Sequence, residues 1–328
     1  MIAAAGLDRL LGDPRWSPHP VVVMGWWIQR LRRLAEAWAG DSPWRLRTTG
    51  GLITLLLVAG SGLAGWGLER LAVVQPATTP LLLIAMASAL AGRSLEQAVR
   101  RVLRLLPAAD GPGADLEPAR RALGWIVGRD THRLDRGEIL RAAAETASEN
   151  AVDGLFAPLF WMAVGAACWG ASGLQGPGPL ALAWGFKAAS TLDSMLGYRS
   201  GRLRWLGTAG ARLDDLLVWL PCRLVALSLP LVAGQGPRGC WRQWQLARRD
   251  GAPDPSPNAG RSQAAYAHAA GVQLGGLNHY GDQAKAKPLL AAGQPLPTAA
   301  SVERMLQLTG LLELVWLLPI AALAVGAQ

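Results

Sequence analysis

The sequence predicts an all-α, polytopic integral membrane protein with about five apolar segments joined by polar helical loops. The chain has 328 residues, of which 51% are hydrophobic and only 17% charged, and long stretches carry no charge at all. Soluble domains carry about 25% charged residues, and roughly 20 apolar residues in a helix cross a bilayer core of about 30 Å. The composition therefore excludes a plain soluble enzyme and a disordered or fibrous chain.

Uncharged runs place the expected membrane helices in order along the chain. Runs of 18, 22 and 33 residues occupy 51–68, 71–92 and 154–186, and two further apolar runs occupy 216–233 and 308–325. Gly-Pro-Gly-Pro at 176–179 breaks the third run, which predicts two helices joined by a tight turn, the second ending near Leu196. Pro221, Arg223 and Pro230 interrupt the fourth run, which favours a re-entrant or interfacial hairpin over a full crossing.

The remaining segments complete the expected organisation as a single membrane-embedded domain, 1–328. Residues 1–11 are not a secretory signal and give either a short first membrane segment or an interfacial one. A polar block at 93–153 is expected to carry part of the site, opening with a helix near Arg93 and closing with a second helix from about Asp135. A second polar block occupies 234–307.

The formal charge of +9 fits a multi-pass protein of a bacterial inner membrane better than a nucleic-acid binder. Lys and Arg concentrate in cytoplasmic loops, which places 12–50, 93–153 and 199–215 on the cytoplasmic side and the neutral turns outside. The partners expected on this basis are the lipid bilayer and no nucleic acid. The three cysteines imply no disulfide or zinc framework.

The densest polar cluster is a four-residue repeat of Arg141, Glu145, Glu149 and Asp153. In a helix these side chains form one stripe. Because like charges at this spacing repel each other, a bound cation explains three acids in a row, and Mg²⁺ carrying a nucleotide phosphate is the natural candidate. The alternative is a solvated helix face on which Arg141 offsets part of the charge.

A second cluster, Lys187, Thr191, Asp193 and Ser194, closes an apolar helix. Ionisable groups in such a helix are costly and indicate function. For Lys187 the alternative is an ammonium that reaches the membrane interface along its own aliphatic chain.

Two further clusters follow along the chain. In the run Ala-Arg-Leu-Asp-Asp-Leu, Asp215 is a candidate metal ligand near Arg212, although a surface ion pair explains the same residues. Ser256 and Asn258 lie in a proline-stiffened loop that either presents fixed donors and acceptors or is only a turn.

His19, near Asp13, is either a proton carrier or the cap of a turn, and the cap is the favoured interpretation. Arg129 and Asp130 belong to another cluster of polar residues. The chain contains no phosphate-loop, nucleophile-elbow or zinc-protease motif, so the common soluble ATPase, hydrolase and zinc-protease classes lose support.

Several motifs occur together in one order from residue 7 to residue 260. They are Leu-Asp-Arg-Leu-Leu-Gly-Asp-Pro at 7–14, His-Pro at 19–20, Gly-Arg-Asp-Thr at 128–131, Glu-Thr-Ala-Ser-Glu-Asn-Ala-Val-Asp-Gly at 145–154, Lys-Ala-Ala-Ser-Thr-Leu-Asp-Ser-Met-Leu-Gly-Tyr at 187–198, Ala-Arg-Leu-Asp-Asp-Leu at 211–216 and Ser-Pro-Asn-Ala-Gly at 256–260. This ordered set resembles the adenosylcobinamide-phosphate synthase family (CbiB, also called CobD) of cobalamin biosynthesis. The chain departs from the family pattern in its short apolar segment before Asp8 and in His279, where an aromatic residue is more usual.

The resemblance implies an ATP-dependent amide ligase that joins adenosylcobyric acid, a corrinoid, to (R)-1-amino-2-propanol or its O-phosphate. Mg²⁺ is the implied cofactor, ATP the co-substrate, and the site faces the cytoplasm. The expected catalytic residues are Glu145, Glu149, Lys187 and Asp193, and the expected metal ligands are Glu145, Glu149, Asp153 and Asp215. The expected substrate- and nucleotide-binding residues are Asp13, His19, Arg129, Asp130, Asn150, Thr191, Ser194, Arg212, Ser256 and Asn258.

Two other classes remain open at this point. A transporter or binding protein for a corrinoid or an ion is suggested by Asp193, Arg223 and Glu313 in apolar segments, although the paired repeats of many transporters are absent from the sequence. A membrane phosphotransferase would also use acidic clusters on membrane helices, but it would release a nucleotide from a CDP-type donor. A homo-oligomer is compatible with either function.

Overall fold

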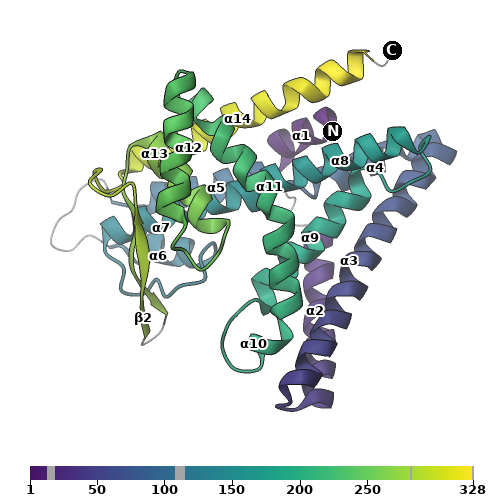
Figure 1. The fold of residues 1–328 in the computed structure, drawn as a ribbon, viewed down its shortest axis with the longest axis horizontal. Coiled ribbons are helices and arrows are strands. Elements are labelled where there is room, and N and C mark those ends of the chain that lie inside the picture. The colour runs from purple at the N-terminus through teal and green to yellow at the C-terminus, as the bar shows by residue number, and fades with distance from the viewer. Residues whose placement is uncertain (13–18, 108–114, 281–282, 327–328) are drawn as a thin grey trace. The chain divides into compact units, whose positions relative to one another are not determined.

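The computed structural model describes residues 1–12, 19–107, 115–280 and 283–326. Within these ranges the chain is helical apart from one two-stranded hairpin and its connections (Figure 1). The chain forms two compact units, each built from two separate stretches: Met1–Ala91 with Asp153–Val218, and Gly92–Val152 with Trp219–Gln328. The mostly helical class expected from the sequence is confirmed, and the hairpin is the exception to it.

The first unit is a set of packed helices. It contains α1 (Ile2–Leu11), α2 (Pro20–Ala39), α3 (Pro43–Val74), the 3₁₀ turn η1 (Pro76–Thr78), α4 (Thr79–Ala87), α8 (Ala157–Ala171), α9 (Pro179–Leu196), α10 (Leu203–Leu206) and the first part of α11 (Thr208–Val232). In Figure 1, α3 and α9 run side by side, and Ile28, Leu46 and Leu192 lie in the core that they share with α2. Gly65 permits this packing, because a Cβ atom there would lie 2.8 Å from the Cα of Ala181.

Helix α3 continues through Glu69 and Arg70, where the sequence placed a boundary between two uncharged runs. The carboxylate of Glu69 is fully buried and accepts the backbone N–H groups of Gly178 at 2.8 Å and Ala181 at 3.2 Å. These N–H groups lie at the start of α9, where they have no partner within the helix, so the buried charge is satisfied and does not end α3. The helix ends instead before Pro76, since a proline disfavours helix in the preceding residue.

The turn expected at 176–179 is confirmed. Helix α8 ends at Ala171, α9 begins at Pro179, and α9 ends at Leu196 as the sequence predicts.

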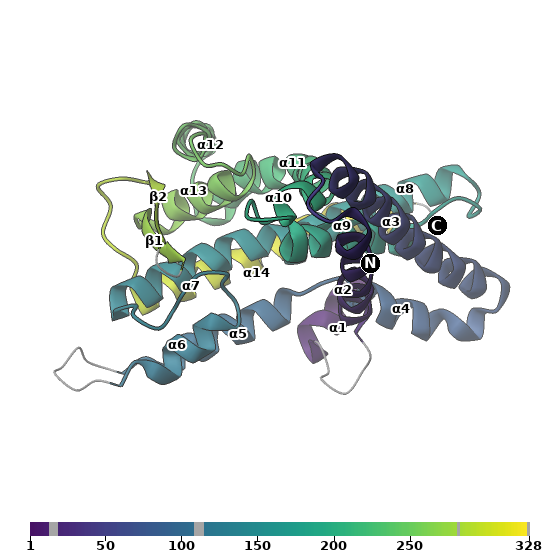
Figure 2. The ribbon, with the colours of Figure 1, turned by 90° about the horizontal axis from the view of Figure 1, so that it is seen from below.

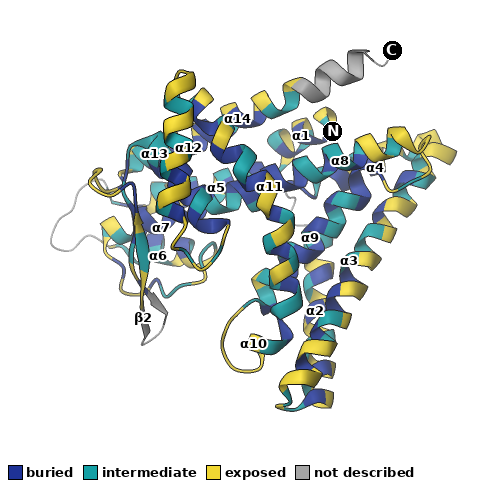
Figure 3. Ribbon diagram, viewed as in Figure 1, coloured by how far each residue is buried: buried dark blue, intermediate teal, exposed yellow. Residues whose placement is uncertain are grey.

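Among the described residues, four helical stretches are long and apolar enough to cross a membrane by length and composition, and the protein is accordingly a multi-pass membrane protein. They are Pro43–Val74, Pro76–Leu105, Arg136–Ala171 and Thr208–Val232. Helix α3 carries exposed leucines, among them Leu55 and Leu63. Yellow segments along α3 in Figure 3 mark its exposed residues. Such a surface is unfavourable in water and suits lipid. Helix α1, with ten residues, is about half the length needed to span a bilayer.

The second unit combines helices with the hairpin. It contains α5 (Gly92–Leu105), α6 (Glu117–Gly124), α7 (Arg136–Ala151), the remainder of α11, α12 (Pro237–Gly251), α13 (Ala259–Ala270), β1 (Leu274–Tyr280), β2 (Gln283–Leu290) and α14 (Ala299–Gly326). The strands are antiparallel, with Asn278 opposite Lys285, and the register shifts between Leu274 and Gly276. Figure 2 shows the hairpin beside α13, which it contacts. The helices expected near Arg93 and from about Asp135 are confirmed as α5 and α7.

Helix α11 corrects the expected hairpin at 216–233, because it is one continuous helix that contains both Pro221 and Pro230. A proline within a helix leaves the carbonyl four residues earlier without its usual partner. For Pro221 that carbonyl belongs to Leu217, and it accepts the indole N–H of Trp161 at 3.1 Å. Arg223 is satisfied as well, since its guanidinium donates to the Trp219 carbonyl and stacks 4.1 Å from the Trp219 ring.

Candidate functional site

Helix α7 lies at the centre of the second unit, where it contacts α5, α6, α13, α14 and β1. Asp135 caps its first turn by accepting the N–H of Glu138 at 2.8 Å, while the Glu138 side chain accepts the N–H of Asp135. Alanines occupy most of its middle and are buried on all sides, which lets neighbouring elements approach closely. Because Glu145 is only 3% exposed, a solvated helix face does not explain this member of the acidic stripe.

Glu145 is held between two arginines. Its Oε2 atom accepts a hydrogen bond from Arg129, and its Oε1 atom accepts from Nη1 of Arg141 at 3.3 Å and from the N–H of Gly275 at 3.0 Å. All three charged side chains are at least nine-tenths buried. Charges removed from water to this extent are stable only when paired and hydrogen-bonded, which this arrangement provides.

The hairpin supplies the remaining partners of these arginines. Arg141 donates to the carbonyl of Gly275 at 2.8 Å, to the carbonyl of Leu277 at 2.7 Å and to Oδ1 of Asn278 at 3.0 Å, and Arg129 also donates to Asn278. Gly275 has φ +84°, and a Cβ atom there would lie 1.9 Å from the carbonyl oxygen of Pro288. Glycine is therefore required where β1 turns its carbonyls toward α7.

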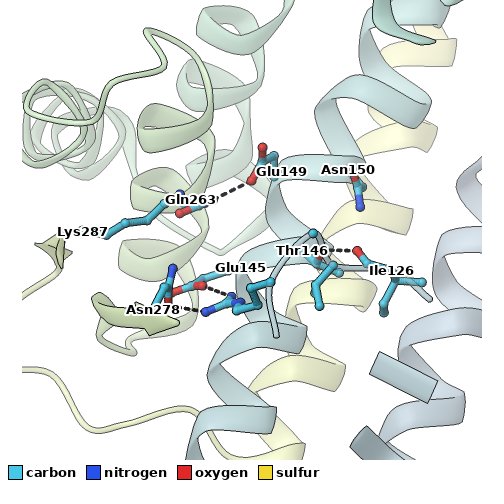
Figure 4. Close-up of a pocket in the computed structure, with 11 residues that line it drawn as sticks. Ile126, Glu145, Thr146, Glu149, Asn150, Gln263, Asn278 and Lys287 are labelled. Carbon is cyan, nitrogen blue, oxygen red and sulfur yellow. Dashed lines mark hydrogen bonds and ion pairs between the residues drawn. The ribbon is translucent and has the colours of Figure 1, made fainter. Parts of the chain in front are cut away.

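Next to this network lies a polar pocket of about 250 Å³ within the second unit (Figure 4). Glu149 lies one helical turn beyond Glu145, and its Oε2 atom accepts a hydrogen bond from Nε2 of Gln263 at 2.7 Å. Lys287, on β2, forms an ion pair with Asp254 at 3.6 Å. The lining residues are Ile126, Val127, Gly128, Arg129, Glu145, Thr146, Glu149, Asn150, Gln263, Asn278 and Lys287. The pocket thus has cationic, anionic and amide groups on its walls.

Asp250, on α12, links the hairpin to α12 and α13 through hydrogen bonds. Its Oδ2 atom lies 2.9 Å from Nε2 of His268 on α13 and accepts the N–H of Ala291, the residue after β2, at 3.2 Å. Burial alone would raise the pKa of Asp250, but hydrogen bonds from Arg249, His268 and Ala291 outweigh it and hold that pKa below its usual value. Asp250 therefore fixes the end of the strand that carries Lys287.

The residues expected from the sequence divide between the two units. In the second unit the pocket brings together Arg129, Glu145, Glu149 and Asn150. The second unit also contains Asp130, Ser256 and Asn258. The first unit contains His19, Asp153, Lys187, Thr191, Asp193, Ser194, Arg212 and Asp215. Asp13 lies outside the described residues.

Several of these side chains make local bonds that build the fold. His19 caps α2 by accepting the N–H of Val21 at 3.3 Å, in agreement with the favoured interpretation. Ser256 accepts the N–H of Ala259 at 3.2 Å, at the first turn of α13, and Asn258 accepts from Arg223 at 3.0 Å. Asp130 accepts the N–H of His132 at 2.9 Å. Their roles toward substrate stay predictions.

Sequence reasoning missed Gln263, Asn278 and Lys287, which line the pocket from α13 and the hairpin. Gly275 and Gly276 lie shortly before Asn278 and could have drawn attention to this segment of the sequence. Both adopt a positive φ, which favours glycine. Gln263 and Lys287 meet Glu149 only through tertiary folding, so nothing in their local sequence marks them.

Throughout the described part of the chain, no group of three or more His, Cys, Asp or Glu side chains could hold a metal ion. Both oxygens of Glu145 already accept hydrogen bonds from arginines and a backbone N–H. A Mg²⁺ ion carried by a nucleotide needs only one or two carboxylates, and Glu149 is the pocket carboxylate that fits this requirement.

Comparison with known proteins is consistent across nearly the whole chain. A family model described as CobD/Cbib protein matches residues 1–309. The chain is 43% identical to the cobalamin biosynthesis protein CobD of Synechocystis sp. over 90% of this chain and 83% of that protein. It is 40% identical to the CobD protein of Chromobacterium violaceum over 98% and 95%, and 37% identical to the cobalamin biosynthesis protein CbiB of Salmonella typhimurium over 92% and 89%. No solved structure matches the chain.

Proposed function

Because this chain belongs to the CobD/CbiB family of cobalamin biosynthesis proteins, we propose that it is an ATP-dependent amide ligase. The proposed reaction joins adenosylcobyric acid to (R)-1-amino-2-propanol or its O-phosphate. The proposed place is the inner membrane of a bacterium, with the site facing the cytoplasm, where ATP is available.

The observation that carries this proposal is the mixed charge of the pocket in the second unit. Arg129 and Lys287 supply cations that suit phosphate oxygens, and Glu149 supplies a carboxylate. A ligase of this type must hold a nucleotide phosphate, a substrate carboxylate and an amine close together. A pocket whose side chains carried only one sign of charge would not bind all three groups.

The chemistry requires an activated carboxylate, because a carboxylate is a poor electrophile. The substrate carboxylate oxygen attacks the terminal phosphorus of ATP, the bond to ADP breaks, and an acyl phosphate forms. The amine nitrogen then attacks the acyl carbon, inorganic phosphate leaves, and the nitrogen loses a proton. Mg²⁺ bound to the nucleotide would neutralise phosphate charge and help to align the reacting groups.

In this proposal the residues of the pocket have distinct tasks. Arg129 stabilises negative charge on the transferred phosphate, and Glu145 fixes the position of Arg129. Glu149 would hold the Mg²⁺ of the nucleotide. Asn150 and Lys287, which lie on opposite sides of Glu149 in Figure 4, are proposed to contact substrate or nucleotide.

The roles of the first-unit residues are also proposals, drawn from the family resemblance. Lys187 and Asp193 are proposed as catalytic residues, and Asp153 and Asp215 as metal ligands. The substrate-binding roles of Asp13, His19, Asp130, Thr191, Ser194, Arg212, Ser256 and Asn258 rest on the same basis.

The transporter alternative depends on charged residues in apolar helices, but one of these, Arg223, is engaged in the fold. Its guanidinium donates to Asn258 and stacks on Trp219. These contacts support a structural role for Arg223 and give no support to an ion path.

The test uses detergent-purified full-length protein with adenosylcobyric acid, Mg²⁺-ATP and either aminopropanol phosphate or the free amine. Mass spectrometry follows the amide product and ADP. We expect product that depends on ATP, and the preferred amine identifies the natural substrate. Tight binding of the corrinoid without product from either amine would refute the ligase and favour the transporter.

A further inference from the structure

Gln263 lines the pocket and carries a buried hydrogen-bond acceptor. The residue is 1% exposed, and its Nε2 atom donates to Glu149. Its Oε1 atom is also buried, and among the described residues it has no hydrogen-bond partner. Buried polar atoms of native proteins are nearly always bonded, so an acceptor left alone on a residue that lines a pocket indicates a ligand that donates.

The orientation of the Gln263 amide is fixed by Glu149. The amide turns its nitrogen toward Glu149, because its Nε2 atom donates to Oε2 of that carboxylate. The carbonyl oxygen therefore points away from Glu149. Figure 4 shows both side chains at the pocket, together with Lys287.

The chemistry of the reacting groups selects the ligand of this oxygen. A substrate carboxylate and a terminal phosphate are acceptors and would be repelled by a carbonyl oxygen. The amine is the one reacting group that carries N–H donors. We propose that Oε1 of Gln263 binds the nitrogen of the amine substrate and makes Gln263 a specificity-determining residue, an assignment that rests on the proposed ligase function.

The first experiment replaces the amide by a side chain of similar size without an oxygen, Gln263→Met. With the full-length protein, we expect the KM for aminopropanol phosphate to rise by about 10-fold or more, since a hydrogen bond in a desolvated site is lost. The KM values for ATP and the corrinoid should stay within about twofold. The matched control is Gln273→Met. The side-chain amide oxygen of Gln273, Oε1, accepts the N–H of Gly293, and Gln273 is not among the residues that line the pocket. The control should leave all three KM values unchanged.

A binding measurement independent of turnover compares aminopropanol phosphate with the analogue in which a methyl group replaces the amine. The unmodified protein should prefer the amine, and Gln263→Met should lose this preference. Gln263→Glu retains an oxygen acceptor at this position and should keep most of the preference, which covers the case in which Gln263→Met does not fold.

The outcomes separate this inference from the ligase proposal. Absence of amide product with the unmodified protein refutes the ligase. If product forms while Gln263→Met leaves the KM for the amine within twofold, the inference about Gln263 fails and the ligase stands. A rise confined to the KM for ATP would assign Oε1 to the nucleotide and overturn the inference equally.

Discussion

Glu145 and Glu149 lie one helical turn apart on α7, yet their carboxylates have different surroundings. Both oxygens of Glu145 accept hydrogen bonds, from two guanidinium groups and a backbone N–H. Glu149 is half-buried and receives one hydrogen bond from a neutral amide. Identical side chains on one face of a helix thus divide into a carboxylate that holds the fold and a carboxylate that faces the pocket.

Replacing the pocket carboxylate, Glu149→Gln, should remove turnover and spare the fold. The amide keeps the size of the side chain but loses the charge proposed to hold Mg²⁺, so we expect kcat to fall at least about 100-fold. The ATP-dependent amide assay measures this, and thermal unfolding in detergent should shift by no more than about 1 °C, which corresponds to a loss of less than about 1 kcal/mol for a chain of this length. Near-normal turnover would rule out the assigned role.

Replacing the structural carboxylate, Glu145→Ala, should instead destabilise the protein. The change leaves Arg129 and Arg141 buried without their counter-charge, which typically costs about 3–5 kcal/mol. The matched control is Glu303→Ala, which removes the half-exposed partner of Arg100 and should cost no more than about 1 kcal/mol. Thermal unfolding of both variants gives the comparison. Equal losses would mean that the buried network adds no more stability than a surface ion pair.

At the scale of elements, local patterns predicted the helices, and tertiary partners decided the exceptions. The charge pattern located α5 and the start of α7, and Gly-Pro-Gly-Pro located the turn before α9. The end of α3 was placed too early because Glu69 is satisfied by backbone N–H groups from α9, which are distant in sequence. The same reason explains α11, whose Pro221 is compensated by Trp161.

For the candidate site, too, the residues in local motifs were predicted from the sequence, and those brought in by tertiary contacts were not. Arg129, Glu145, Glu149 and Asn150 come from motifs that are compact in sequence, and the pocket contains all four. The hairpin was not expected, so its Asn278 and Lys287 were missed. The site is completed by strands whose carbonyls bind Arg141, and such a contact has no signature in a single segment.

Asp250 links α12, α13 and the end of β2, and its contribution should depend on pH. Since its pKa is lowered in the folded protein, it stabilises the fold above its unfolded pKa of about 3.9, and this stabilisation is lost as pH falls through the folded pKa. We expect Asp250→Asn to unfold at a lower temperature than the unmodified protein by a constant amount from about pH 7 to pH 5. The difference should shrink below about pH 4. A difference that does not change down to pH 3 would show that the charge of Asp250 is not its source.

At the scale of the whole molecule, α3 carries the evidence for orientation. The helix has 32 residues, which corresponds to about 48 Å and exceeds the bilayer core. Near its first turns Arg47 and Arg204 stack on Trp205, 4.3 and 4.9 Å from the ring, and Arg202 pairs with Asp41. At its other end Trp66 donates to the carbonyl of Gln175. The end near the first turns is therefore the richer in arginine, as expected at a cytoplasmic interface, whereas tryptophan occurs at both ends.

The orientation follows as a prediction about two exposed positions at opposite ends of α3. In a variant without Cys168, Cys222 and Cys240, a cysteine introduced as Asp41→Cys should react with a membrane-impermeant maleimide only in inverted membrane vesicles. One introduced as Gln175→Cys should react in intact spheroplasts, because it lies in the neutral turn between α8 and α9. Labelling of both positions from one side would mean that α3 does not cross the membrane. The reverse pattern would place the arginine-rich end of α3 outside, which removes the charge-distribution argument for a cytoplasmic site.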